Sequence, residues 1–136
     1  MNAPDPQQSM PRTLALIRAA LLIGVFVFGL IAWLLTRSGG LAALDPPVLA
    51  LFRSVLAVAL VIVAVGLIVL RRKRRERSSY QGKASYTIIG WALAEFVAFG
   101  GGVYFIITGN ALYYLLGFAL LFAANFVMLP LPEQAR

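Results

Sequence analysis

The sequence lacks cysteine and histidine altogether, and only five of its 136 residues are acidic. Without thiols, disulfides, thiolate catalysis and cysteine lipidation are excluded. Without imidazole or thiolate ligands, the usual haem and zinc sites are excluded as well. The few carboxylates lie mostly outside the apolar runs, so we expect no metal and no cofactor. Ser54 and Ser85 have no base to activate them, so we expect no enzymatic activity.

Charge is also scarce, because only 12% of the residues are charged while 61% are hydrophobic. A soluble domain usually carries about a quarter charged residues, so this chain needs lipid as its solvent. Four apolar runs are long enough to cross ~30 Å of hydrocarbon as helices. They occupy residues 14–36, 48–70, 87–107 and 111–129. We therefore predict an all-α integral membrane protein, a single membrane domain over residues 1–136, with four transmembrane helices forming a bundle of two antiparallel hairpins.

The breaks between the runs contain turn residues. Ser38-Gly39-Gly40 ends the first helix, and Pro46 and Pro47 fit the first turn of the second helix. The turn at 108–110 is so short that the third and fourth helices must be antiparallel neighbours. The first run is too long for a signal-peptide core and lacks a cleavage site, so we expect it to be a retained helix.

Most of the positive charge lies in one stretch, which we predict to be a loop over residues 71–85. Seven of the twelve basic residues are there: Arg71, Arg72, Lys73, Arg74, Arg75, Arg77 and Lys83. By the positive-inside rule this loop is cytoplasmic. Four spans then place both termini in the cytoplasm, and we expect a multi-pass protein of the inner (plasma) membrane. The cluster could also attract anionic lipid head groups. Because the charge is not spread along a face, no nucleic acid partner is expected.

Glu95 is the only acidic residue inside any run. It lies ~13 Å past the inner end of its helix, where a charge costs about 2.5–3.5 kcal/mol to insert. An expensive residue on a glycine-rich, weakly apolar helix suggests a use. The same helix carries small residues spaced by four, a pattern that lets another backbone approach closely. This helix-packing stripe consists of Gly90, Ala94, Ala98 and Gly102.

Few polar residues inside the runs could pair with Glu95. Arg18 and Asn125 lie at a similar depth in the inner half, whereas Arg53 lies in the outer half. We predict a polar cluster of Arg18, Glu95 and Asn125. In the alternative, Arg18 and Arg53 merely extend to the nearest interface. Glu95 itself could be a structural partner in such a network, could bind and release protons or cations, or could contact another subunit.

The stretch Ala92-Leu93-Ala94-Glu95-Phe96-Val97-Ala98-Phe99-Gly100 resembles the carboxylate helix of proteolipid c subunits of rotary ATP synthases and ATPases. The resemblance implies that Glu95 carries an ion, with Gly100 at the glycine position that follows it. It covers about nine residues. The alternating glycines of that family's partner helix are missing, because the first run has only Gly24 and Gly29 and the second only Gly66.

Two functional hypotheses follow from these features. The first is a non-catalytic accessory or scaffold subunit of a larger membrane complex, such as an energy-converting one. Its partners would be other membrane subunits or further copies of the chain. The alternative is a proteolipid-like protein that handles protons or cations through Glu95. A third hypothesis, an oligomeric small-molecule transporter, has only Glu95, Arg18, Arg53 and Asn125 to line a polar path.

Overall fold

The computed structural model describes residues 6–39 and 45–131, which fold into helices without any strand. The elements are α1 (Pro6–Arg37), α2 (Pro46–Arg75), α3 (Tyr80–Thr108), α4 (Leu112–Ala123) and a π-helical turn, η1 (Ala124–Met128). The predicted all-α class is confirmed. Within the described part, three helices are long and apolar enough to cross a membrane, and they include Pro11–Arg37, Pro46–Arg75 and Tyr80–Thr108. The fourth apolar segment, Leu112–Met128, is shorter.

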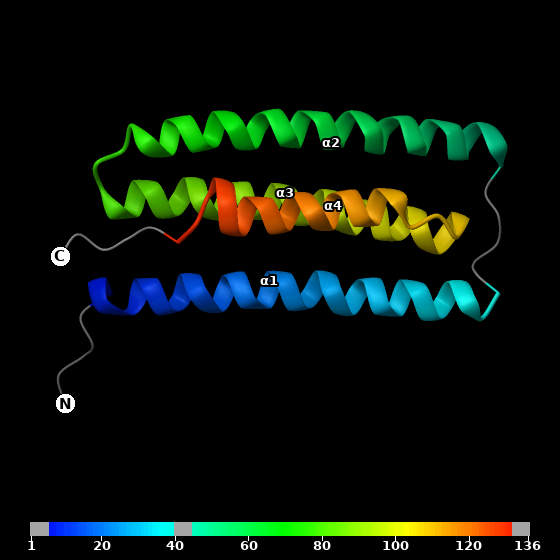
Figure 1. Cartoon of the computed structure of the whole chain (residues 1–136), viewed down its shortest axis with the longest axis horizontal. Helices are drawn as coiled ribbons and strands as arrows, with labels where there is room; N and C mark the ends of the chain where they lie inside the picture. The colour runs from blue at the N-terminus through cyan, green and yellow to red at the C-terminus, as the bar shows by residue number, and fades with distance from the viewer. Residues whose placement is uncertain (1–5, 40–44, 132–136) are drawn as a thin grey trace.

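Helix α3 is the centre of the bundle. Each helix runs opposite to the one before it, and α1 and α2 lie on opposite sides of the α3–α4 pair (Figure 1). Helix α3 packs against all three other helices, whereas α1 and α2 make almost no contact with each other. Of the two hairpins that the sequence predicts, α3 and α4 therefore pack directly on each other, whereas the packing of α1 and α2 within the described residues is on α3. The α3–α4 pair lies between α1 and α2 and keeps them apart (Figure 1).

The turn between α3 and α4 has the short form that the sequence predicts. Gly109 ends α3 in the left-handed region, at φ 72°, and its N–H donates to the Phe105 carbonyl at 2.8 Å. The Asn110 side chain then accepts a hydrogen bond from the Leu112 N–H at 2.9 Å. A left-handed C-cap strongly favours glycine, so Gly109 fixes where the chain reverses.

The predicted basic loop over residues 71–85 is mostly helical, which corrects the sequence analysis. Helix α2 continues through Arg75, and α3 already begins at Tyr80, so residues 76–79 alone connect the two helices. Arginine and lysine are good helix formers, and cations in a last turn interact favourably with the helix dipole. Ser79 caps α3, since its hydroxyl accepts a hydrogen bond from the Gly82 N–H at 3.2 Å. The drop in hydropathy after residue 70 therefore shows where the apolar run ends, but the helix itself continues to Arg75.

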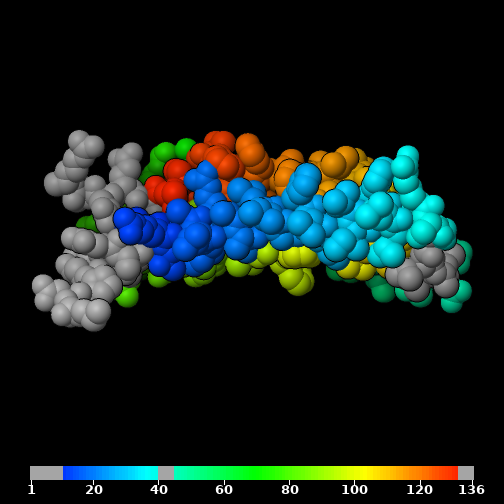
Figure 2. All heavy atoms as spheres, turned by 90° about the horizontal axis from the view of Figure 1, so that it is seen from below, coloured from blue at the N-terminus to red at the C-terminus, as the bar shows by residue number. Residues whose placement is uncertain are grey.

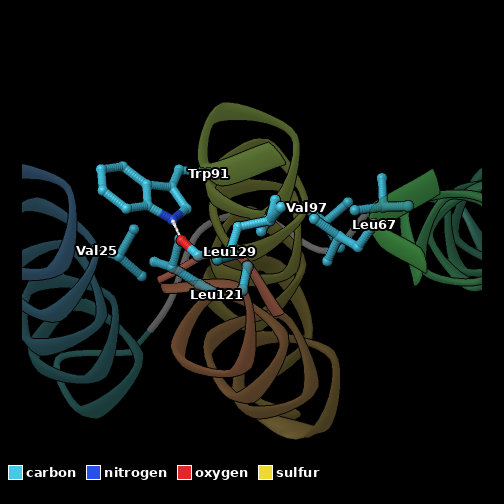
Figure 3. Close-up of a cluster of buried hydrophobic side chains, with 10 residues drawn as sticks. Val25, Leu67, Trp91, Val97, Leu121 and Leu129 are labelled. Carbon is cyan, nitrogen blue, oxygen red and sulfur yellow. Dashed lines mark hydrogen bonds between the residues drawn. The ribbon is translucent and has the colours of Figure 1, made fainter. Parts of the chain in front are cut away.

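The main core lies where α3 meets the other helices, toward the basic end of the bundle, where α2 ends and α3 begins. Figure 3 shows Val25 of α1 on one side of the α3–α4 pair and Leu67 of α2 on the other. Its buried members are Val25, Val63, Leu67, Trp91, Ala94, Val97, Ala98, Leu121, Ala124 and Leu129. A smaller cluster at the other end contains Ala32, Phe105 and Ile106.

The molecule is a rod with α1 lying along one face (Figure 2). In this view α4 and η1 border α1 on one edge, and α3 borders it on the other. The outer faces of α1 and α2 carry many exposed apolar side chains, including Phe26 and Leu51. Such large apolar faces are typical of contact with lipid or with another protein.

Candidate functional site

The four small residues of the predicted packing stripe on α3 are all buried. A Cβ atom added at Gly90 would collide with the Leu129 side chain, and one at Gly102 would collide with the Phe28 ring. Ala94 and Ala98 have no exposed surface. The stripe therefore receives side chains from α1 and from the chain that follows η1.

The closest backbone approach, between α3 and α4, uses glycines that the sequence analysis did not single out for this role. A Cβ at Gly101 would lie 2.6 Å from the Tyr113 carbonyl carbon, and one at Gly117 would lie 2.6 Å from the Ala98 Cα. Ala94, Ala98 and Gly101 follow steps of four and three, the spacing of a helix that packs along one partner. A uniform spacing of four leads from Ala98 to Gly102, so the predicted stripe does not include Gly101, which contacts α4.

Glu95 lies at the border between the buried and the exposed faces of α3. Its neighbour Ala94 is fully buried, whereas Phe96 is 75% exposed, and Glu95 itself is half-buried. Among the described residues, no side chain or backbone group forms a hydrogen bond or ion pair with its carboxylate. The carboxylate thus reaches the outer surface of the bundle without a partner from the described part of its own chain.

The predicted polar cluster does not form within residues 6–39 and 45–131. The Arg18 guanidinium instead lies over the Phe126 ring, 3.8 Å from its centroid. Asn125 is fully buried and donates through Nδ2 to the Leu121 carbonyl at 2.8 Å, while its Oδ1 has no partner. Arg53 is exposed on α2. Depth along a helix could be read from the sequence, but the direction in which each side chain points could not.

Asn125 sits in the π-helical turn that ends the fourth apolar segment. There the Leu129 N–H donates to the Ala124 carbonyl five residues back, at 2.9 Å. The Leu129 carbonyl in turn accepts a hydrogen bond from Trp91 Nε1 at 3.1 Å (Figure 3). Trp91 is completely buried, so this bond satisfies an indole N–H that has no access to water. The Trp91 hydrogen bond therefore connects α3 to the residue that follows η1.

A second hydrogen bond connects α4 to α1. The Tyr114 hydroxyl donates to the Val25 carbonyl at 2.9 Å. The ring can approach because Gly29 has no side chain, since a Cβ there would collide with the Tyr114 hydroxyl. Both this hydrogen bond and that of Trp91 join residues that are far apart in the sequence. No local sequence pattern could therefore predict either of them.

Six of the seven clustered basic residues line two hollows at the basic end. Arg71, Arg74, Arg75 and Lys83 line the first, and Lys73 and Arg77 line the second together with Glu76 and Tyr86. Arg77 Nη2 donates to the Tyr86 hydroxyl at 3.3 Å. This hydrogen bond, reinforced by the charges of Tyr86 and Glu76, raises the pKa of Arg77. Arg72 is exposed.

Comparisons of the chain with protein-family models, with curated proteins and with solved structures found no match. The resemblance of residues 92–100 to the c subunits stays a prediction from the sequence. The function therefore has to be argued from the geometry of this chain alone.

Proposed function

We propose that the chain crosses the membrane four times, as two successive helical hairpins, with both termini and residues 76–79 in the cytoplasm. Three helices have the required length and mean hydropathy. The 17-residue segment Leu112–Met128 is at the lower limit for a span. The alternating helix directions (Figure 1) and the basic residues at one end support this topology.

The absence of cysteine allows a direct test of this topology. Single cysteines at Ser78, at the basic end, and at Asp45, at the opposite end, lie at exposed positions. In intact cells an impermeant maleimide should label Asp45→Cys, and it should label Ser78→Cys only after the membrane is opened. Equal labelling of both in intact cells, or extraction of the chain by alkaline carbonate, would contradict the topology.

Within that topology, we infer that the chain is a non-catalytic subunit that holds together a larger membrane assembly, either with other subunits or with further copies of itself. The observation that carries this proposal is the half-buried Glu95 without a partner among the described residues. A carboxylate facing hydrocarbon is expensive. A basic or hydrogen-bonding side chain on a neighbouring subunit would remove that cost.

The surface around Glu95 fits a docking helix. Ala92, Leu93 and Phe96 are exposed beside it on α3. They form an apolar surface with one polar group at its edge. Polar contacts between membrane helices contribute about 0.6–1.7 kcal/mol each, which is enough to select a partner when the rest of the face is apolar.

Extraction in a mild detergent, followed by native gel and native mass spectrometry, tests this proposal. The wild-type chain should migrate in a complex. Glu95→Ala and Phe96→Ala should weaken that complex about three- to tenfold. The matched control Leu51→Ala removes an exposed side chain from α2 and should leave the complex unchanged. A wild-type chain that is a pure monomer at every detergent concentration would contradict the role.

The partly exposed carboxylate of the half-buried Glu95 also favours a second candidate function, the binding of protons or cations. No fixed cation neutralises its carboxylate within the described residues, so the group would be free to exchange a proton. A carbodiimide should then label Glu95 and block proton flux into liposomes, and Glu95→Gln should abolish both effects. Proton flux that is unchanged in Glu95→Gln would eliminate this candidate.

A further inference from the structure

Four cations converge on one hollow at the basic end of the bundle. This basic hollow has a volume of about 390 Å³ and is lined by Arg71, Arg74 and Arg75 of α2, by Lys83 of α3, and by Val127, Met128, Pro130 and Leu131. None of the described residues that line it carries a carboxylate. It combines strong positive charge on one wall with apolar side chains on the other.

The neighbouring hollow shows that this arrangement is not a general property of the basic segment. It has a volume of about 300 Å³ and contains Glu76 beside Lys73 and Arg77. Glu76 is the one acidic residue between Asp45 and Glu95. The carboxylate of Glu76 therefore lies with the other cations, and among residues 6–39 and 45–131 no acidic side chain compensates the charge of the basic hollow.

Arg74 holds the basic hollow together. Its Nη2 donates to the Pro130 carbonyl at 2.6 Å, which joins the end of α2 to the chain that follows η1. Its Nε is buried without an acceptor. Arg74 is therefore anchored by the protein itself, while the side chains of Arg71, Arg75 and Lys83 make no hydrogen bond or ion pair within the described part of the chain.

An open apolar groove lies along the same seam, between α2 and α4, farther from the basic end of the bundle. It has a volume of about 410 Å³ and is lined by Leu60, Val61, Ala64, Leu116, Ala119, Leu120 and Ala123. Ala64 and Arg71 are two turns apart on α2, and Val127 of η1 follows Ala123, the last residue of α4, by about one turn. At 1.5 Å per residue, the groove begins about 10 Å from the basic hollow on α2.

The two features together match the chemistry of one amphiphile. A phosphate head group needs several cations close together, and an acyl chain needs a narrow apolar channel that leads away from them toward the membrane interior. An acidic soluble ligand would use the hollow and leave the groove open. We propose that the α2–α4 seam binds one anionic phospholipid, with its phosphate in the basic hollow and an acyl chain in the groove. This proposal rests on the membrane insertion proposed above, and does not depend on the role of Glu95.

Native mass spectrometry with defined lipids tests the site on the full-length chain. Phosphatidylglycerol should stay bound where phosphatidylcholine is lost. The triple variant Arg71→Gln, Arg75→Gln, Lys83→Gln should weaken phosphatidylglycerol binding about ten- to a hundredfold. The matched triple Arg72→Gln, Lys73→Gln, Arg77→Gln removes the same charge from the same segment and should retain binding within about twofold. Arg74 stays unchanged because of its bond to Pro130.

A second pair of variants distinguishes a phospholipid from free phosphate. Ala64→Phe fills the groove, and Ala50→Phe adds the same ring at an exposed position elsewhere on α2. Ala64→Phe should weaken phosphatidylglycerol binding, while Ala50→Phe should not. Equal losses in the two charge triples would overturn the proposal, and so would displacement of the lipid by inorganic phosphate together with full binding in Ala64→Phe. The cysteine labelling described above is measured first, so failed insertion is distinguished from a failed lipid site.

Discussion

Helices α1 and α2 are more apolar than α3 but less buried, whereas in a soluble protein the more apolar helices are usually the more buried ones. The most apolar windows of α1 and α2 have mean hydropathies of 2.6 and 2.8, yet only 17% and 11% of their residues are buried. The window of α3 has a mean hydropathy of 1.5 and is 50% buried. In lipid, apolar side chains gain little by packing on each other, and small residues that allow close contact decide which helices associate. Composition thus predicts insertion, while glycine and alanine positions predict the core.

The largest expected change in stability comes from replacing the buried one of the two tryptophans, which lie one in each region. Trp91 on α3 is fully buried and bonded to the Leu129 carbonyl, whereas Trp33 on α1 is 42% exposed beside Arg37. Trp91→Ala should lower the free energy of unfolding by about 3–5 kcal/mol. Trp33→Ala should lower it by less than about 1 kcal/mol, because an exposed cation–π contact contributes little. Steric trapping in bicelles measures both, and similar losses would remove the contrast between the regions.

A smaller effect, with opposite signs in the two regions, is expected from Gly→Ala changes. At Gly117 a Cβ would lie 2.6 Å from the Ala98 Cα, while at Gly66 on α2 nothing lies within 4 Å. Gly117→Ala should destabilise the bundle by about 1–3 kcal/mol because α3 and α4 must separate. Gly66→Ala should stabilise it by up to about 1 kcal/mol through helix propensity. The same unfolding assay decides, and a stable Gly117→Ala would refute the close α3–α4 approach.

The smallest expected effect concerns the hydrogen bond between α4 and α1. Tyr114→Phe removes the donor to the Val25 carbonyl and should cost about 0.5–1.5 kcal/mol of unfolding free energy. Tyr113→Phe is the matched control, because its ring packs edge-on against Tyr104 at 5.2 Å and its hydroxyl makes no hydrogen bond among the described residues. If both variants unfold alike, the hydroxyl bond does not fasten α1 to the bundle.

The sequence predicted the helices and the turn at Gly109 well, because apolar length and turn residues are local signals. It misjudged the basic segment, where α2 continues as a helix through Arg75 although its hydropathy ends earlier. It also grouped Arg18 with Glu95 by depth, whereas Arg18 packs on Phe126. The direction in which a side chain points depends on which helices pack together. That packing is set by contacts between residues far apart in the sequence, such as Gly117 and Ala98.

Cross-linking in native membranes tests the central position of α3 most directly. The chain has no cysteine, so pairs can be introduced cleanly. Pairs at Phe28 with Gly102 and at Leu56 with Gly100 bridge α3 to α1 and to α2, because a Cβ at either glycine would lie against the other residue's side chain. A pair at Val25 with Leu67 joins α1 and α2 across the bundle (Figure 3). We expect a short bifunctional reagent to link the first two pairs and to leave the third unlinked. Efficient linkage of Val25 to Leu67 within one chain, with none through α3, would contradict the account.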